Sequence, residues 1–229
     1  QAVGAVKRVL REGGYAKTKV GHGGTLDPLA EGVLPIALGE ATKLAGRMLD
    51  ASKIYEFTIK FGEETDTLDT EGAVIDRSDV LPSREEVEGV LPQFTGPIEQ
   101  VPPAYSALKV DGKRAYDLAR AGQEVELKTR AVTIHALSIT GEGKEATSTR
   151  TAHGSKGTYI RSLARDIAHA LGTVGHVTYL RRTKAGPCVE SQAISLDKLN
   201  EMANGAQLSD LLLPLEAGLD DIPALSLSQ

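Results

Sequence analysis

Residues 21–35 place one aspartate and one histidine among glycines and prolines. The segment reads Gly-His-Gly-Gly-Thr-Leu-Asp-Pro-Leu-Ala-Glu-Gly-Val-Leu-Pro, and we call it the Asp27 loop. Its four glycines allow close backbone approaches, and its two prolines stiffen the exit. An aspartate before proline is by itself a common turn starter, so the dipeptide alone favours a structural role. The whole segment instead predicts a rigid loop that presents Asp27 and His22 to something outside the chain.

A second candidate is Arg161, in the segment Gly-Thr-Tyr-Ile-Arg-Ser-Leu-Ala-Arg-Asp at residues 157–166. A guanidinium can hold a carboxylate by two parallel hydrogen bonds, which fixes the carboxylate and keeps it ionised. An arginine at a helix start is usually a surface residue, where the helix dipole disfavours it mildly. This unfavourable position is weak support for a functional role.

Both segments resemble motifs of the TruB-type tRNA pseudouridine synthases. The Asp27 loop matches the family's G-H-x-G-x-L-D-P-x-A-x-G-x-L-P, and residues 157–166 match G-T-Y-I-R-x-L-x-R-D. A third block, residues 101–120, resembles P-P-x-Y-S-A-L-K-x-x-G-x-R-A-Y-x-x-A-R. Dyskerin-like, guide-RNA-dependent relatives read differently in this third block. The resemblance therefore extends over nearly the whole chain and is to the stand-alone bacterial type.

The resemblance implies that Asp27 is the catalytic carboxylate and that Arg161 pairs with it. Making pseudouridine breaks the N–C glycosidic bond of uridine, rotates the uracil and rejoins it through carbon. A carboxylate beside the electron-poor C1′ can stabilise it, attack it or remove a neighbouring sugar proton, as carboxylates do in related glycosidase chemistry. The sequence leaves covalent attack and proton removal at C2′ open. We expect no cofactor, because the leaving base is also the incoming nucleophile.

Four further positions match residues that contact the nucleotide in this family. By resemblance, Tyr55 stacks on the target uracil, Tyr159 and Leu180 line the same pocket, and His22 wedges into the gap left by the flipped base. Stacking on an aromatic face contributes about 1–3 kcal/mol per base. For Tyr55 a core role is the alternative, because it shares a strand face with aromatic and aliphatic side chains. The family frequently has threonine where this chain has Gly23, and we expect a small effect on binding.

The charge distribution adds tentative phosphate contacts. The net charge is −5, but residues 1–22 sum to +4, residues 150–184 sum to +6 and the rest of the chain sums to −15. Two basic segments could form one face for RNA if the fold joins them, and the alternative is that they are merely solvated. The tentative phosphate contacts are Arg165, Arg181, Arg182 and Lys184.

The implied function is conversion of uridine 55 in the TΨC loop of tRNA to pseudouridine, with the TΨC stem-loop as partner. Such a loop can splay out a base, which suits an enzyme that needs an extruded nucleotide. A guided rRNA modifier is one alternative, and the block at residues 101–120 argues against it. An RNA-binding or tRNA-folding module is the other, and an additional chaperone role stays compatible with catalysis. We expect no obligate protein partner.

Composition narrows the class of protein. The chain has 229 residues, and no apolar run approaches the roughly 20 residues that a membrane span needs. The single Cys188 excludes an internal disulfide and fits a reducing compartment, so we expect a cytoplasmic location. The five scattered histidines show no metal-ligand spacing, so we expect no metal site.

The elements that must position these residues can be read from periodicity. Apolar residues at helical spacing predict a helix over residues 158–171, ended by Gly172. Strict alternation predicts a half-buried strand over residues 53–62. Residues 63–72 are acidic and predict a loop with a structural or capping role rather than a calcium site. Further helices are predicted over 2–12, 40–50, 84–91, 113–121 and 196–203, and further strands over 73–76, 124–140, 144–153, 174–184 and 187–190.

Mixed helices and hairpins indicate an α+β fold. By resemblance this is the pseudouridine synthase catalytic core, a mixed, mostly antiparallel sheet flanked by helices. We expect the catalytic domain over residues 1–212, without the family's N-terminal D-K-P-x-G-x-x-S segment. Residues 213–229 are expected to lead into a C-terminal PUA-like domain that is largely absent.

Overall fold

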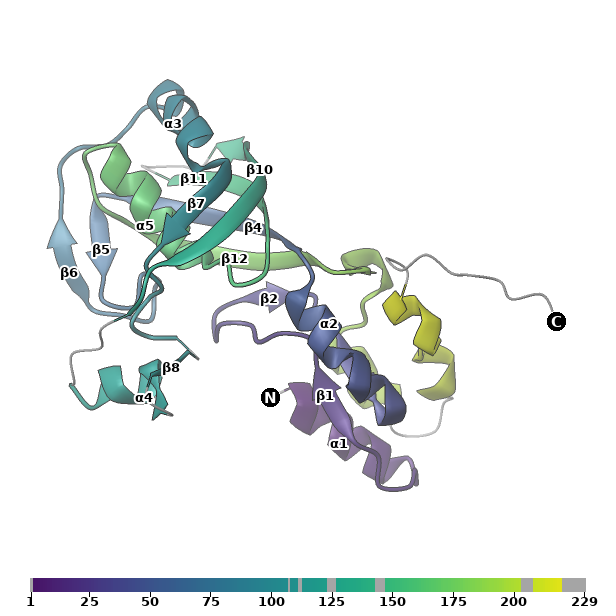
Figure 1. The fold of residues 1–229 in the computed structure, drawn as a ribbon. Helices are drawn as coiled ribbons and strands as arrows, with labels where there is room; N and C mark the ends of the chain where they lie inside the picture. The colour runs from purple at the N-terminus through teal and green to yellow at the C-terminus, as the bar shows by residue number, and fades with distance from the viewer. Residues whose placement is uncertain are drawn as a thin grey trace. The chain divides into compact units, whose positions relative to one another are not determined.

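A computed structural model of the chain describes six stretches (Figure 1): residues 2–106, 108–110, 113–122, 127–142, 147–202 and 208–219. The dipeptide Asp111-Gly112, which by its sequence predicts a hairpin-type turn, lies outside these residues. The chain divides into two compact units. The first unit is formed from the described residues of 1–27, 32–51 and 182–229, and the second from those of 28–31 and 52–181.

A largely antiparallel sheet is the framework of the second unit. Its strands lie in the order β12-β4-β11-β10-β7, and each pairing along β4-β11-β10-β7 is antiparallel. The strands are β4 (Lys53–Phe61), β7 (Gly96–Gln100), β10 (Arg130–Glu142), β11 (Thr147–Gly154) and β12 (Gly175–Ala185). This confirms the predicted α+β class with a mostly antiparallel sheet.

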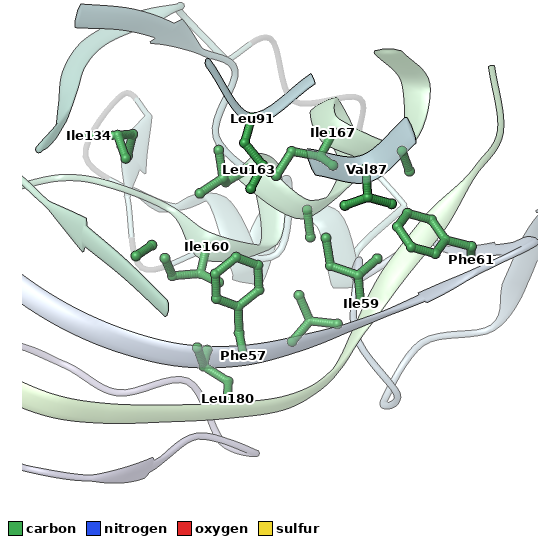
Figure 2. Packing of buried hydrophobic residues seen from close by; sticks show 14 residues of the cluster. Phe57, Ile59, Phe61, Val87, Leu91, Ile134, Ile160, Leu163, Ile167 and Leu180 are labelled. Carbon is green, nitrogen blue, oxygen red and sulfur yellow. The ribbon is translucent and has the colours of Figure 1, made fainter. Parts of the chain in front are cut away.

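One face of this sheet is covered by α5 (Ile160–Ala170), the helix predicted over residues 158–171. The alternation on β4 is confirmed, because Phe57, Ile59 and Phe61 are buried on the face that meets α5. In Figure 2, Ile160 at the start of the helix lies beside Phe57 of the strand, and Leu163 and Ile167 lie beside Leu91 in the same cluster. Burying a large apolar side chain contributes about 1.5–3 kcal/mol, so this layer holds the helix against the sheet.

The chain leaves α5 at Gly172, whose φ of +70° is in the left-handed region that glycine adopts without strain. The start of another helix, α3 (Arg84–Val90), is set by a capping box between Ser83 and Glu86, a pattern that the sequence shows. The Ser83 amide donates to Glu86 at 2.7 Å, and the Glu86 amide donates to the Ser83 hydroxyl at 3.3 Å. Hydrogen bonds from the Ser83 backbone amide and from the Ser83 side chain hold the pKa of the Glu86 carboxyl below its ordinary value.

The prediction of a continuous loop over residues 63–72 is wrong at its start. Residues Glu63–Thr65 form β5, which pairs antiparallel with β6 (Val74–Arg77). The remainder is a turn held by Asp69, whose Oδ1 accepts hydrogen bonds from the Thr67 hydroxyl at 2.6 Å and the Glu71 amide at 3.0 Å. The capping role expected for this acidic stretch is thus confirmed at Asp69.

The first unit has its own small core. It joins α1 (Ala2–Glu12), β1 (Val20–His22), β3 (Ile36–Leu38) and α6 (Leu196–Met202). Val9 of α1 is fully buried, and Leu199 of α6 packs in the same cluster. Ser195 caps α6, because its hydroxyl accepts a hydrogen bond from the Lys198 amide at 3.1 Å. The helix predicted over residues 40–50 is a 3-10 turn, η1 (Gly39–Leu44), followed by α2 (Ala45–Asp50).

The remaining elements are short. They are β2 (Glu31–Gly32), η2 (Leu91–Phe94), β8 (Lys109–Val110), β9 (Lys113–Arg114), α4 (Ala115–Arg120), β13 (Cys188–Val189), η3 (Glu190–Gln192), η4 (Leu208–Leu211) and η5 (Leu215–Leu219). Burial raises the pKa of the Cys188 thiol. Among the described residues, no helix has the length and apolar character needed to cross a membrane.

A buried arginine stands out in the core of the second unit. Arg150 on β11 is fully buried, and its Nε and Nη2 have no hydrogen-bond partner among the residues that the structure describes. Its Nη1 donates to the Ser148 carbonyl at 2.9 Å, and its guanidinium carbon lies 5.5 Å from the centre of the Phe61 ring. Burial lowers the pKa of Arg150 to about 10, which leaves the group charged at neutral pH.

We therefore expect Arg150→Met to stabilise the protein. Replacing a buried charge by an apolar side chain of similar volume raises the free energy of unfolding by about 1–3 kcal/mol in such cases. Urea unfolding followed by circular dichroism measures it, with the exposed Arg84→Met as the matched control, for which we expect a change within about 0.5 kcal/mol. A loss of stability in Arg150→Met would show that the guanidinium contributes more than its desolvation costs.

Candidate active site

The Asp27 loop is closed at its base by strand pairing within the first unit. Strands β1 and β3 pair antiparallel, with His22 opposite Ile36. The Gly23 amide then donates to the Pro35 carbonyl at 2.9 Å. Residues 24–34 are therefore connected at both ends to a stem formed by the paired strands β1 and β3. This agrees with the rigid loop that the sequence predicts.

Arg182, near the end of β12, forms hydrogen bonds with both limbs of this loop. Its Nε donates to the Val33 carbonyl at 2.8 Å, Nη2 to the Gly24 carbonyl at 3.1 Å and Nη1 to the Thr25 carbonyl at 3.3 Å. The side chain is only 1% exposed. The expectation that Arg182 contacts phosphate therefore needs correction, because its donors are directed at the protein's own backbone.

Two glycines of the loop stand where no side chain fits. A Cβ on Gly32, whose φ is +96°, would lie 2.2 Å from the Arg182 carbonyl oxygen. A Cβ on Gly23 would lie 2.4 Å from the Cβ of Met48 on α2, which is buried. A threonine at position 23 would therefore overlap Met48.

We expect Gly23→Thr to lower the free energy of unfolding by about 1–3 kcal/mol through overpacking against Met48. Met48→Gly removes the obstructing Cβ, so the double variant should lose at least about 1 kcal/mol less than the two single variants together. Denaturant unfolding of all four proteins measures this coupling. Strict additivity would mean that the loop moves away from Met48 rather than meeting it.

Asp27 and His22 both lie half-buried in the first unit, within reach of solvent. The His22 Nδ1 accepts a hydrogen bond from the Gly24 amide at 3.3 Å, so the neutral ring carries its proton on Nε2. Gly24 in turn gives its carbonyl to Arg182. The imidazole is thereby connected to the same backbone framework that carries Asp27.

Arg161 is buried at the start of α5 in the second unit. It is 4% exposed, contrary to the surface position typical of an arginine at a helix start. Its Nη1 donates to the Thr67 carbonyl at 2.8 Å and its Nη2 to the Tyr105 carbonyl at 2.9 Å. The carboxylate of Asp69 lies 3.8 Å from Nη1. Arg161 therefore ties α5 to two loops that are distant in the sequence.

The two tyrosines and Leu180 also lie in the second unit. Tyr55 is half-buried on β4, where it packs at the margin of the core, so part of the core alternative is correct. Tyr159 directly precedes α5, and Gln100 bonds both of its backbone polar groups, at 3.1 and 3.3 Å. Leu180 is buried within the core cluster.

Gln100 is a residue that sequence reasoning missed. It is 1% exposed, and its amide fixes the backbone of Tyr159 where the chain enters α5. Its position at the end of β7 carries no local signal, because the partner lies 59 residues away. Only the pairing of distant segments brings the two together.

The other tentative phosphate contacts remain at least partly accessible. Arg165 bonds Asp166 through Nε at 2.9 Å, and Arg181 bonds Glu31 through Nη1 at 2.8 Å. Lys184 is exposed. Beside Arg181, burial and the nearby Glu31 carboxylate raise the pKa of the Tyr179 phenol.

A hollow of about 610 Å³ in the second unit includes none of the predicted site residues. It is lined by Glu88, Leu91, Pro92, Thr95, Leu137, Ser138 and Ile139. Among the residues that the structure describes, no three His, Cys, Asp or Glu side chains are grouped to hold a metal ion.

Comparison with known proteins assigns the family. Residues 9–160 match the TruB family pseudouridylate synthase N-terminal domain, and residues 161–220 match the tRNA pseudouridylate synthase B C-terminal domain. The chain is 68% identical to the tRNA pseudouridine synthase B of Novosphingobium aromaticivorans, over 99% of this chain and 76% of that protein. It is 61% identical to that of Zymomonas mobilis, over 100% of this chain and 75% of the relative.

Solved structures agree with this assignment. A crystal structure of a Cbf5–Nop10–Gar1 complex matches with a TM-score of 0.69 and 28% identity, over 95% of this chain and 56% of the matched one. An H/ACA RNP bound to a substrate RNA containing 2′-deoxyuridine matches with a TM-score of 0.68 and 25% identity, over 95% of this chain and 55% of the other. With both family domains matched in order along residues 9–220, the chain belongs to the TruB family of pseudouridylate synthases.

Proposed function

We propose that this chain isomerises uridine 55 in the TΨC loop of tRNA to pseudouridine, with Asp27 as the catalytic carboxylate on a flipped-out nucleotide. In this reaction the N1–C1′ bond breaks, the uracil rotates and a C5–C1′ bond forms. The hydrogen on C5 leaves as a proton, and N1 gains one. No oxidant, reductant or external nucleophile enters the balance.

The observation that carries the proposal is the way the chain builds the Asp27 loop. A strand pair closes its base, a buried arginine holds both limbs, and Asp27 stays accessible between them. Fixing a reacting group before the substrate arrives removes entropy from the activation barrier. Relatives that are 68% and 61% identical carry the name tRNA pseudouridine synthase B, which supports tRNA as the substrate.

The remaining assignments follow from the same family. We propose that Arg161 orients the reacting carboxylate, that Tyr55 and Tyr159 hold the flipped uracil, and that Leu180 closes the apolar side of its pocket. His22 would fill the gap in the RNA stack, for which a flat imidazole is suited. Arg165, Arg181 and Lys184 are the candidates for phosphate contacts.

Tritium release tests the reaction and its position. A tRNA transcript labelled at uracil C5 should lose one label per molecule, because forming the C5–C1′ bond expels that hydrogen. A matched transcript with cytidine at position 55 should release none. Equal release from the two transcripts would overturn the choice of uridine 55. Binding without any release would favour an RNA-binding module over an enzyme.

A further inference from the structure

The strongest unassigned feature is the position of Arg182 relative to the Asp27 loop. Its three hydrogen bonds go to Gly24 and Thr25, which precede Asp27, and to Val33, which follows it. The two limbs of the loop are therefore joined through one side chain. A planar guanidinium with donors in fixed directions can do this, whereas the point charge of lysine cannot reproduce all three bonds.

The backbone of Arg182 adds a second attachment. Its carbonyl accepts a hydrogen bond from the Val33 amide at 2.7 Å. Gly32 packs so closely on the backbone of Arg182 that any Cβ would overlap it. The side chain and the backbone of Arg182 thus hold the returning limb of the loop at Gly32 and Val33.

Burial makes these contacts strong determinants of loop shape. Arg182 is 1% exposed, and Gly24 and Val33 are also buried. Without the guanidinium, the carbonyls of Gly24 and Val33 would lack this donor, and an unpaired buried polar group is costly. A shift of the loop toward water would then become favourable, because water could hydrogen-bond these carbonyls. Because the Gly24 amide also bonds His22, a shift would displace both candidate site residues.

We propose that Arg182 is a positioning residue for the reaction, one that fixes Asp27 and His22 through the loop backbone and does not contact RNA phosphate. The inference rests on the proposed role of Asp27. It predicts a defect in the chemical step rather than in tRNA affinity. A displacement of about 1 Å at a reacting group can cost about 100-fold in rate.

The test uses Arg182→Met, which keeps volume, and Arg182→Lys, which keeps charge, with Arg84→Met as a surface control. Single-turnover label release at saturating tRNA should fall about 100-fold per folded molecule in Arg182→Met. Arg182→Lys should fall less, and the tRNA dissociation constant should stay within about threefold, because phosphate contacts supply the affinity. Arg84→Met should match the parent.

Hydrogen exchange gives a second readout that does not depend on activity. Amides of residues 23–33 should exchange faster in both Arg182 variants, while those of β4 and α5 keep the parent rates. A parent-like rate per folded molecule in Arg182→Lys and Arg182→Met would overturn the proposal. Weakened tRNA binding with a full saturated rate would overturn it too, in favour of a phosphate contact. If the parent releases no label, the proposed function fails, and exchange alone still decides whether Arg182 holds the loop.

Discussion

Asp27→Asn is expected to reduce tritium release from uracil-labelled tRNA by at least about 10³-fold, a loss of the size seen when one electrostatic group is removed from the reacting centre. Asparagine has nearly the same shape but carries no charge and is a poor nucleophile and base. It therefore cannot stabilise or attack C1′, nor remove a sugar proton. Single-turnover release at saturating tRNA measures this effect without a contribution from binding.

The same variant separates an enzyme from a binding module. Its tRNA affinity should change little, because phosphate contacts dominate affinity for RNA. Its free energy of unfolding should change by less than about 1 kcal/mol, because asparagine keeps the shape and one acceptor oxygen of the half-buried Asp27 side chain. Asp210→Asn, an exposed aspartate in the same unit, is the matched control and should release label at the parent rate. Undiminished label release by Asp27→Asn would overturn the catalytic assignment. If this variant changed tRNA folding but not label release, a chaperone role would be favoured.

Arg161→Met is expected to lower the free energy of unfolding by about 3 kcal/mol. The change removes a buried donor pair, so the carbonyls of Thr67 and Tyr105 lose their hydrogen bonds and the buried Asp69 loses the cation 3.8 Å away. Each of these losses leaves a polar group in a poorly solvated place. Guanidinium or urea unfolding gives the midpoint and slope that measure the effect.

Arg165→Met, one helical turn further on, is the matched control for stability. Its side chain is partly exposed and its ion pair with Asp166 is near the surface, so a loss below about 1 kcal/mol is expected. Arg161→Lys should recover part of the loss. Well below its unfolding midpoint, Arg161→Met should also release label about 100-fold more slowly if Arg161 orients the reacting carboxylate. Unchanged stability would mean that the two carbonyls find other donors.

Local signals were sufficient for much of the fold. The alternation on β4, the apolar stripe of α5 and the capping box of α3 each lie within about a dozen consecutive residues. Such patterns act through neighbouring backbone and side-chain geometry, so the sequence alone predicts them. The glycines and prolines of the Asp27 loop are informative for the same reason. Strand β5 was missed because its partner, rather than its own sequence, makes it a strand.

Only the tertiary structure decided whether the arginines are buried and which groups they bind. Arg150, Arg161 and Arg182 belong to the basic segment 150–184, for which the sequence left an RNA-binding face and merely solvated charges open, yet all three are buried. Arg182 bonds carbonyls that are 149, 157 and 158 residues away, and Arg161 bonds carbonyls 94 and 56 residues away. The sequence by itself supplied the candidate residues for the chemistry and predicted the rigid loop that carries Asp27. Whether an arginine binds phosphate or a backbone carbonyl depends on which carbonyls lie near it after folding. Every residue has a backbone carbonyl, so the residue types in the sequence do not show which carbonyl will accept the hydrogen bond.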